Sequence, residues 1–386
     1  MDFAATTEQR RMIAGARRFA SGLGRLGEGL DESDFNKAGW EACAQYGVLG
    51  WLTPQEYGGA GLDPLSAALS LEALGAGCAD NGLLFAVNNH LFACTTYLLD
   101  HGTPEQRFEW LPALASGSVI GAHALTEVTA GSDVLSMRTV ARRVGDRFVI
   151  DGRKTYVSNG PVAGLFVVFA RTDEGAPGQA SISAFLVPST QSGVTVRPLA
   201  KMGLGGTPMG EVTFEDCAVP ATSLLGEPGG AYQMFQTGLV WERGFMFATQ
   251  VGALERLLDE MVAHCNERRQ FGRTIGSNQS VAHRIADHKV RVETSKLLLH
   301  KMAWKVKAGH LAIEEACMLK LWVSEALKSI SLDLLQLRGA AGFLAGAPAE
   351  RQVRDSLAAT IYGGTSEIQR SAIAAMSGLV VSGASS

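Results

Sequence analysis

The spacing of apolar residues changes twice along this chain of 386 residues, and the two changes limit the folds that it can adopt. Up to residue 122, apolar residues recur every three or four positions, as on one face of a helix. Between residues 123 and 230, short runs rich in Val, Ile and Phe alternate with turn signals such as Asp151-Gly152. From residue 231 onward the helical spacing returns, in segments long enough for several turns each.

The middle region predicts strands at its apolar runs, which are residues 148–150, 165–170, 183–187, 194–196 and 211–214. No segment long enough for a connecting helix separates these runs, so an antiparallel sheet is favoured over parallel βαβ units. Two long helical segments near the C-terminus, 251–269 and 281–309, favour an antiparallel bundle. We therefore predict a multidomain α+β fold. Its parts are an N-terminal helical domain (1–122), a middle antiparallel β-barrel or sandwich domain (123–230) and a C-terminal four-helix bundle (231–386).

Composition argues against several classes of protein. Apolar residues make up 46% of the chain and charged residues 19%, a balance typical of globular proteins. The net charge of −4 and the scattered Lys and Arg residues argue against nucleic-acid binding. The N-terminal segment MDFAATTEQRRMIAGARRFA has no apolar core of the signal-peptide kind, and no apolar run approaches the ~18 residues of a membrane span. The six cysteines form no CxxC pair, so we expect buried thiols and no metal site. We also expect a cytoplasmic protein without a membrane partner.

Gly22, Gly24 and Gly27 spell GxGxxG, the pattern of dinucleotide-binding loops. That pattern binds a pyrophosphate only after a strand and at the start of a helix. Here it follows the helical segment RRMIAGARRFA, so we expect its glycines to end a helix instead.

Four segments combine small, hydroxyl-bearing and amide side chains. They are AHALTEVTAGSD (122–133), KTYVSNG (154–160), ERRQFGRTIGSNQSV (267–281) and QLRGAAGF (336–343) with the later IYGGTSEIQR (361–370). Each alone could be an ordinary loop or helix end. In this order, and spread over most of the chain, they resemble the acyl-CoA dehydrogenase family, whose members bind FAD. The helix–β–helix order of the three regions agrees with that resemblance.

The resemblance implies that the first segment contacts the flavin. Thr126 and the backbone at Leu125 match positions at the pyrimidine edge of the ring, while Gly131 and Ser132 match positions at the phosphates. His123 belongs to the same cofactor-binding segment. Small residues let the backbone approach an anion closely, and hydroxyl groups can satisfy buried polar atoms of the ring.

In the second segment the resemblance implies that Tyr156 forms an aromatic wall against the flavin and that Ser158 places a hydroxyl near its N5. The family usually has Trp and Thr at these two positions. Taken alone, Tyr156 could equally be a strand aromatic in the core.

The third segment matches family positions that reach the flavin of a neighbouring subunit, so the resemblance also implies a homodimer or homotetramer. The matching residues are Arg268, Gln270, Phe271 and Gln279. A guanidinium suits a pyrophosphate because its planar fork donates to two oxygens, although Arg268 alone could be a solvated helix end. Further matches to flavin-contacting positions are Gln336, Gly339 and Thr365. Ala340 stands where the family usually has a second glycine.

The loop at 361–370 lacks the acid that most of the family carries there. That position is Gly363, which has no side chain to take a proton. Isovaleryl-CoA dehydrogenase and a few relatives instead place the glutamate on an earlier helix, before an arginine. The stretch TGLVWERGFMFATQ supplies Glu242 followed by Arg243, among apolar neighbours that argue against a surface glutamate. We predict Glu242 as the base and Arg243 in the substrate pocket; the rival, Glu367, is expected to point elsewhere.

The implied reaction is the α,β-dehydrogenation of an acyl thioester. A carboxylate removes the α proton while the β hydrogen leaves as hydride to flavin N5, and donors on the thioester carbonyl stabilise the developing charge. The resemblance implies that the backbone N–H of Gly363 is such a donor. The absence of a side chain at Gly363 predicts room for a branched or cyclic acyl group.

WERG (241–244) and RRQFGRTIGSNQSVAHRIA (268–286) also resemble dehydrogenases that oxidise prolyl and other acyl groups tethered to carrier proteins in natural-product pathways. The substrate would then be held on a phosphopantetheine arm. Coenzyme A shares that arm, so a free short- or branched-chain acyl-CoA is an alternative. The same scaffold could also carry a flavin oxidase or monooxygenase, or a catalytically silent flavin-binding protein. The electron acceptor would be an electron-transferring flavoprotein or oxygen.

Overall fold

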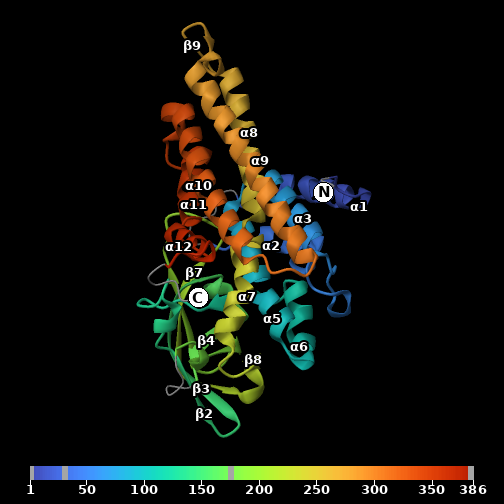
Figure 1. The fold of residues 1–386 in the computed structure, drawn as a ribbon, viewed down its shortest axis with the longest axis vertical. Coiled ribbons are helices and arrows are strands. Elements are labelled where there is room, and N and C mark those ends of the chain that lie inside the picture. Colours follow the sequence, from blue (N-terminus) through green and yellow to red (C-terminus); the bar gives the residue numbers. More distant parts are fainter. Residues whose placement is uncertain (1–3, 28–33, 173–177, 381–386) are drawn as a thin grey trace.

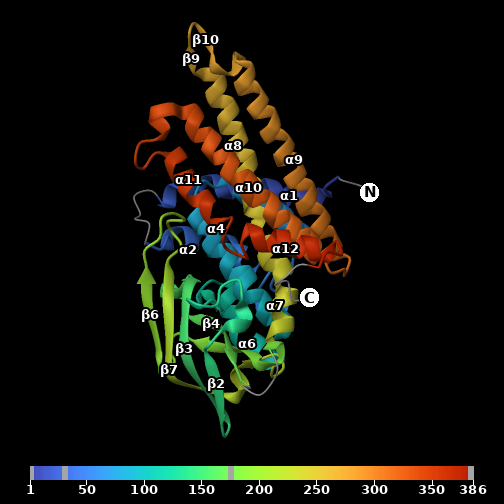
Figure 2. The same ribbon diagram turned by 60° about the vertical axis from the view of Figure 1, so that its left-hand side comes forward.

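The computed structural model describes residues 4–27, 34–172 and 178–380, and these residues form the three predicted regions (Figure 1). The β-rich region occupies one end of the molecule and the long C-terminal helices extend to the other (Figures 1 and 2). The fold class predicted from the sequence is confirmed. The domain boundaries near residues 122 and 230 stay predictions; strand β1 begins at Gly121 and helix α7 at Ala231.

The N-terminal region consists of helices joined by short turns. They are α1 (Thr7–Leu23), α2 (Lys37–Tyr46), α3 (Pro64–Gly77), α4 (Asn81–His90), α5 (Thr96–His101) and α6 (Pro104–Ala115). A side-chain cap starts α1, because Thr6 and Gln9 exchange hydrogen bonds of 2.9 and 3.1 Å between side chain and backbone. Gly22 lies in the last turn of α1, Gly24 is its C-cap, and Gly24–Gly27 form a 3-10 turn, so the GxGxxG segment ends a helix as predicted.

Helices α4 and α5 are joined by one π-helical turn, Leu91–Thr95, into a single stretch. Within the described residues, Asn81–His101 is the one helical stretch long and apolar enough to cross a membrane, and it is almost entirely buried inside the protein. A π turn inserts an extra residue into the helix and so rotates the residues that follow it. That rotation matters for Tyr97, which comes directly after the turn.

The middle region forms an eight-stranded sheet in the order β6–β7–β3–β2–β4–β5–β8, with β1 paired to β4. The strands are β1 (Gly121–Ala124), β2 (Val140–Val144), β3 (Arg147–Ser158), β4 (Leu165–Arg171), β5 (Ile182–Pro188), β6 (Val194–Leu199), β7 (Met209–Pro220) and β8 (Leu224–Leu225). All five predicted strands are present. The purely antiparallel prediction is wrong at β1 and at β2, which both pair parallel with β4. Strands β2 and β3 separate β1 from β4 in the sequence, and this length allows the crossover that parallel pairing requires.

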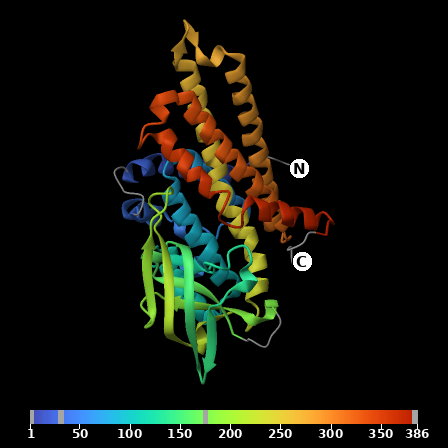
Figure 3. The same cartoon turned by 90° about the vertical axis from the view of Figure 1, so that its left-hand side faces the viewer.

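The C-terminal region is a bundle of long helices (Figures 1 and 3). Its elements are α7 (Ala231–Arg243), α8 (Ala248–Glu267), the hairpin β9 (Arg269–Gln270) and β10 (Arg273–Thr274), α9 (Gln279–Lys307), α10 (Ile313–Arg338), α11 (Pro348–Ala358) and α12 (Ser366–Met376). The hairpin forms the end of the molecule farthest from the sheet (Figure 1). Helix α7 lies beside the sheet and therefore connects the two regions (Figure 2).

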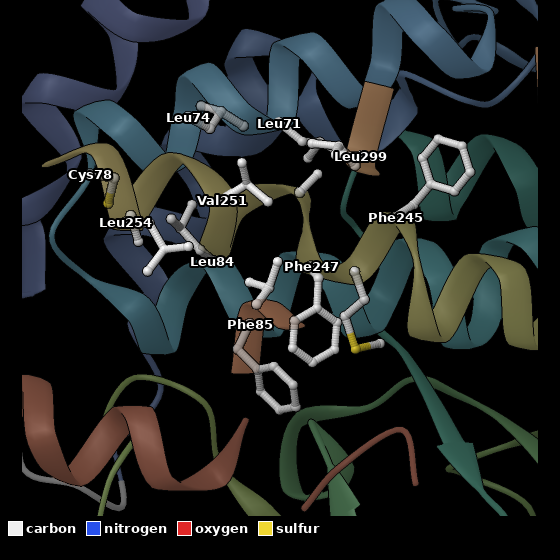
Figure 4. Packing of buried hydrophobic residues seen from close by; sticks show 14 of the residues in the cluster. Leu71, Leu74, Cys78, Leu84, Phe85, Phe245, Phe247, Val251, Leu254 and Leu299 are labelled. Atoms are coloured by element: carbon white, nitrogen blue, oxygen red, sulfur yellow. The ribbon is translucent and has the colours of Figure 1, made fainter. Parts of the chain in front are cut away.

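The main hydrophobic core joins the N-terminal helices to the bundle, with α3, α4 and α8 contributing side chains such as Leu71, Leu84 and Val251 (Figure 4). Helices α3 and α8 cross at two glycines. A Cβ on Gly75 would lie 1.8 Å from the carbonyl oxygen of Thr249, and a Cβ on Gly252 would lie 1.9 Å from that of Glu72. Only glycine permits this approach, which fixes α8 and thus the end of α7 before it.

His90 joins the N-terminal helices to the sheet. Its Nδ1 accepts a hydrogen bond of 2.9 Å from the Gly121 N–H at the start of β1, so its Nε2 carries the proton. That Nε2 donates to the Leu114 carbonyl of α6 at 3.1 Å. The ring is fully buried and is neutral in this arrangement.

We expect His90 to make the protein sensitive to acid. Burial lowers the pKa of His90 from 6.5 to about 4, against the raising effect of its bond to Leu114. Because the folded-state pKa is the lower one, the unfolded chain binds the proton first as the pH falls. The stability contributed by neutral His90 is complete above pH 6.5 and is lost toward pH 4, by about 3 kcal/mol in total. Urea unfolding at several pH values measures this loss of stability. The His90→Asn variant, which can still accept from Gly121, should lack this part of the pH dependence; an unchanged dependence would contradict the assignment.

Candidate active site

The predicted base lies at the end of helix α7. Glu242 and Arg243 form its last turn, and each residue is only 8% exposed. Gly244 ends the helix at a point where a Cβ would lie 2.2 Å from Met302 Sδ of α9. The surface-glutamate interpretation of Glu242 is therefore wrong, because the close approach of α9 buries this helix end.

The Glu242 carboxylate is held by an aromatic neighbour. The Tyr97 hydroxyl of α5 donates a hydrogen bond of 2.6 Å to Glu242 Oε1, and His123 Nδ1 of β1 lies 4.0 Å from the same oxygen. The Tyr97 and His123 rings are stacked with their centroids 5.2 Å apart. Burial, reinforced by the charge of Glu242, raises the pKa of Tyr97 well above its ordinary value, so the phenol stays a donor. Burial lowers the pKa of His123 despite the opposing charge of Glu242, so its imidazole is neutral at pH 7.

The loop that lacks the usual acid meets this helix end. A Cβ on Gly363 would lie 3.4 Å from the carbonyl oxygen of Glu242. Arg243 Nε donates to the Gly363 carbonyl at 3.1 Å, and the Gln369 side-chain amide of α12 donates to the same carbonyl at 3.0 Å. Gly363 has φ +65°, a conformation that favours glycine. Glu242, Arg243 and Gly363 thus form one cluster.

Two other residues of this loop lie where α12 begins. Thr365 is the N-cap of α12, and its hydroxyl accepts from the Ile368 N–H at 3.4 Å. The Glu367 side chain is 80% exposed and lies 3.8 Å from Arg370. Glu367 therefore points to solvent, as predicted for the rival base.

A buried ion pair supports the predicted flavin loop. Lys154 Nζ of β3 donates to Glu127 Oε1 at 2.8 Å and to the Leu125 carbonyl at 2.9 Å. The Glu127 carboxylate also accepts from the backbone of Arg138 at 2.7 Å and of Thr139 at 2.9 Å. Burial lowers the pKa of Lys154 to about 8, although Glu127 raises it, so the ammonium stays charged at neutral pH. Burial alone would raise the pKa of Glu127, but Lys154 and the hydrogen bonds hold it below its ordinary value.

A break in the β3–β7 register turns Tyr156 outward. The register shifts between Lys154 and Val157, and Tyr156 has φ +58°. Its side chain is 59% exposed, so the interpretation of Tyr156 as a core aromatic is wrong. The Thr155 N–H donates to the Thr126 carbonyl at 2.8 Å, which places Tyr156 beside the flavin loop. Ser158 ends β3 and is half-buried.

The remaining predicted cofactor residues lie away from Glu242, toward the far end of the bundle (Figure 1). They are Arg268, Gln270, Phe271, Gln279, Gln336 and Gly339. Phe271 forms the tip of the β9–β10 hairpin with its side chain fully exposed (102%). The end of α10 is held to α8 by Arg338, which lies 2.7 Å from Glu260. One chain therefore does not bring these residues to the loop that contains Gly131 and Ser132.

The residues near the sheet fit a flavin. A Cβ on Gly131 would meet no atom within 4 Å, and Ser132 is exposed, so this backbone is open to an anion. His123 Nε2 is buried and has no hydrogen-bond partner within the described ranges, which suits a polar ligand atom beside it. Exposed Tyr156 next to Thr126 offers a face for a planar ring. The exposed Phe271 and Arg268 could complete such a site only from a second copy.

Sequence reasoning missed the residues that hold the predicted ones in place. Tyr97 contacts Glu242, Lys154 and Glu127 anchor the flavin loop, and Gln369 bonds to the Gly363 loop. Glu127, Lys154 and Gln369 lie inside three of the quoted motifs, which was a usable signal. No local pattern marks Tyr97, since 145 positions separate it from its partner.

Three protein-family models together match most of the chain. Models of the N-terminal, middle and C-terminal domains of acyl-CoA dehydrogenases match residues 6–118, 122–217 and 229–377. The chain belongs to the acyl-CoA dehydrogenase family. This confirms the family and the flavoenzyme class that the sequence motifs predicted.

The relatives include enzymes named for prolyl groups on carrier proteins. An L-prolyl-(peptidyl-carrier protein) dehydrogenase from Pseudomonas fluorescens is 40% identical over 342 residues, which are 88% of this chain and 90% of the relative. The crystal structure of the prolyl acyl carrier protein oxidase AnaB has a TM-score of 0.94 at 39% identity, covering 97% of this chain and 100% of AnaB. The structure of PigA with FAD and proline has a TM-score of 0.92 at 32% identity, covering 98% of this chain and 100% of PigA. The predicted cofactor, FAD, agrees with PigA, whose structure contains FAD.

Proposed function

We propose that this chain catalyses the FAD-dependent α,β-dehydrogenation of an acyl thioester, with Glu242 as the base. The observation that carries the proposal is the contact between the end of α7 and the loop that contains Gly363. A Cβ on Gly363 would lie 3.4 Å from the backbone carbonyl oxygen of Glu242, so the residue that carries this buried carboxylate adjoins the position where most of the family carries its acid.

In the proposed reaction the α proton passes to the Glu242 carboxylate, the Cα–Cβ bond becomes a double bond, and the β hydrogen leaves with its electron pair. The flavin, when bound, supplies the acceptor for that hydride. The Gly363 N–H makes no hydrogen bond within the described residues and can donate to the thioester carbonyl. Arg243 holds the other side of this site by donating to the Gly363 carbonyl at 3.1 Å. Glu242 and Gly363 thus act on adjacent atoms of the substrate.

The proposed acyl group is prolyl, carried on the phosphopantetheine arm of a carrier protein. Relatives that cover nearly the whole chain are named for that substrate. The rings of Tyr97, His123 and Phe169 pack with centroids 5.0 to 5.9 Å apart beside Glu242. This aromatic cluster closes the space next to the carboxylate and favours a compact acyl group over a long chain.

Anaerobic mixing of the holoenzyme with a panel of thioesters tests this function. The panel contains prolyl-carrier protein, prolyl-CoA, isovaleryl-CoA and butyryl-CoA. We expect the prolyl-carrier protein to bleach the oxidised flavin fastest and to yield an acyl group lighter by two hydrogens in mass spectrometry. Faster bleaching by an acyl-CoA would favour a short- or branched-chain acyl-CoA dehydrogenase instead. No bleaching by any of the four would contradict dehydrogenation.

The electron acceptor is proposed to be oxygen or an electron-transferring flavoprotein. One relative is named an oxidase and another a dehydrogenase, so both acceptors have support. The substrate-reduced enzyme can be mixed with oxygenated buffer or with an electron-transferring flavoprotein in stopped flow. The acceptor that restores the oxidised spectrum faster than turnover is the physiological one.

We also propose a cytoplasmic homodimer or homotetramer. The six cysteines are free and buried, as suits a reducing compartment. Along α9, Val290, Leu297 and Trp304 are exposed at seven-residue spacing and form an apolar stripe on the bundle surface. Such a stripe suits a second copy of the bundle, which would also bring in Phe271. Light scattering of the purified protein measures the assembly.

A further inference from the structure

We propose that Tyr97, seated over Gly238, positions the Glu242 carboxylate for proton abstraction. Tyr97 is a positioning residue in this proposal, because it contacts Glu242 rather than the reacting atoms. The inference rests on the proposed function of Glu242 as the base. It adds a residue from α5, which lies outside all four flavin-binding segments and outside the stretch that contains Glu242.

The hydrogen bond uses only one of the two carboxylate oxygens. The Tyr97 hydroxyl donates to Glu242 Oε1 at 2.6 Å, a short bond between two buried groups. No hydrogen bond to Oε2 occurs within the described residues, so that oxygen stays available for the α proton. A bond from a neutral donor to a charged carboxylate holds the carboxylate in one orientation.

A glycine makes room for the phenol. Gly238 lies four residues before Glu242 on α7 and therefore on the same face of the helix. A Cβ on Gly238 would lie 2.6 Å from the Tyr97 hydroxyl oxygen and 2.7 Å from Cζ, distances that real side chains do not reach. The ring thus lies directly against the α7 backbone and extends along it to Glu242.

Neighbouring elements keep the Tyr97 ring in this place. The π turn Leu91–Thr95 precedes it, the Phe169 ring of β4 packs edge-on at 5.9 Å, and the His123 ring stacks at 5.2 Å. The titratable and charged groups that act on Tyr97 and His123 are Glu242, Arg243, Asp100 and Lys154. Of the four, Glu242 takes the Tyr97 hydrogen bond, while Asp100 accepts from Trp241 and Lys154 donates to Glu127.

Tyr97→Phe tests the proposal because it removes the hydroxyl and keeps the ring. We expect the rate of flavin bleaching by the thioester at saturation to fall about tenfold. Flavin content, melting temperature and the substrate concentration for half-maximal rate should be close to those of the wild type.

A second readout does not depend on turnover. The antisymmetric carboxylate stretch of Glu242 can be assigned in infrared spectra by difference from Glu242→Gln, and it reports the hydrogen bond to Oε1. We expect this band to shift in Tyr97→Phe. Tyr57→Phe is the matched control, because Tyr57 is also buried but lies outside the site, and neither its rate nor its band should change.

Gly238→Ala disturbs the same contact by placing a methyl group against the Tyr97 ring. It should slow bleaching in the same way, and adding Tyr97→Phe to it should cost little more, because the displaced ring has already lost its bond. A wild-type bleaching rate and an unshifted infrared band in Tyr97→Phe would overturn the proposal. If none of the thioesters bleaches the flavin of the wild-type enzyme, the proposed function fails. The infrared band still decides in that case whether Tyr97 holds Glu242.

Discussion

Glu242→Gln is expected to slow flavin bleaching by the thioester substrate between about a thousandfold and ten-thousandfold. The amide has the shape of the carboxylate and can still accept from Tyr97, which donates at 2.6 Å in the wild type, but it cannot take up the α proton. Anaerobic stopped flow on the FAD-loaded variant measures the rate. Because shape and burial are preserved, we expect near-normal flavin content and melting temperature.

Glu367→Gln is the matched control for this experiment. Its carboxylate lies in the loop region that resembles the family's active site, yet the side chain is 80% exposed and faces Arg370. The variant should bleach at the wild-type rate. Near-normal bleaching by Glu242→Gln would show that another group takes the proton, and a large loss in Glu367→Gln would identify that group.

Hydrophobic periodicity was enough to predict the order of the three regions, because it reports directly which residues are buried. It missed β1, whose sequence GAHA has no strand-forming residues, and β2, whose sequence VARRV is rich in arginine. Both are strands because of their partners: β1 pairs with β4 and β2 with β3. Pairing of this kind is a tertiary property that local propensity does not contain.

The prediction of Glu242 as the base rests on a different kind of signal. The absent acid at Gly363 and the acid at Glu242 are two halves of one sequence pattern, and their contact agrees with that interpretation. The contacts that hold Glu242 and the flavin loop are not visible in the sequence, although Lys154 and Glu127 lie inside quoted motifs. Tyr97 reaches Glu242 across 145 positions, and Lys154 reaches Glu127 across 27, through packing that a single sequence does not display.

Lys154→Met is expected to reduce the free energy of unfolding by about 3 to 5 kcal/mol, because it leaves the Glu127 carboxylate buried without its cation. Lys154 is fully buried, and methionine fills much of the same volume, so the lost interaction is electrostatic rather than steric. The variant also loses the 2.9 Å bond to the Leu125 carbonyl, which holds the predicted flavin loop. We therefore expect weaker FAD retention as well. Urea unfolding and the ratio of flavin to protein after gel filtration measure the two effects.

The double variant Glu127→Gln/Lys154→Met separates the buried charge from the loop contact. Removing the carboxylate charge should restore part of the stability, since a buried pair costs most when only one partner remains. Flavin retention should stay low, because neither methionine nor glutamine replaces the donor to Leu125. Lys37→Met serves as the control: Lys37 lies 3.7 Å from Glu41 on an exposed helix face, where such pairs contribute less than about 1 kcal/mol. If Lys154→Met were no less stable than Lys37→Met, the Lys154–Glu127 pair could not be what fixes the flavin loop to the sheet.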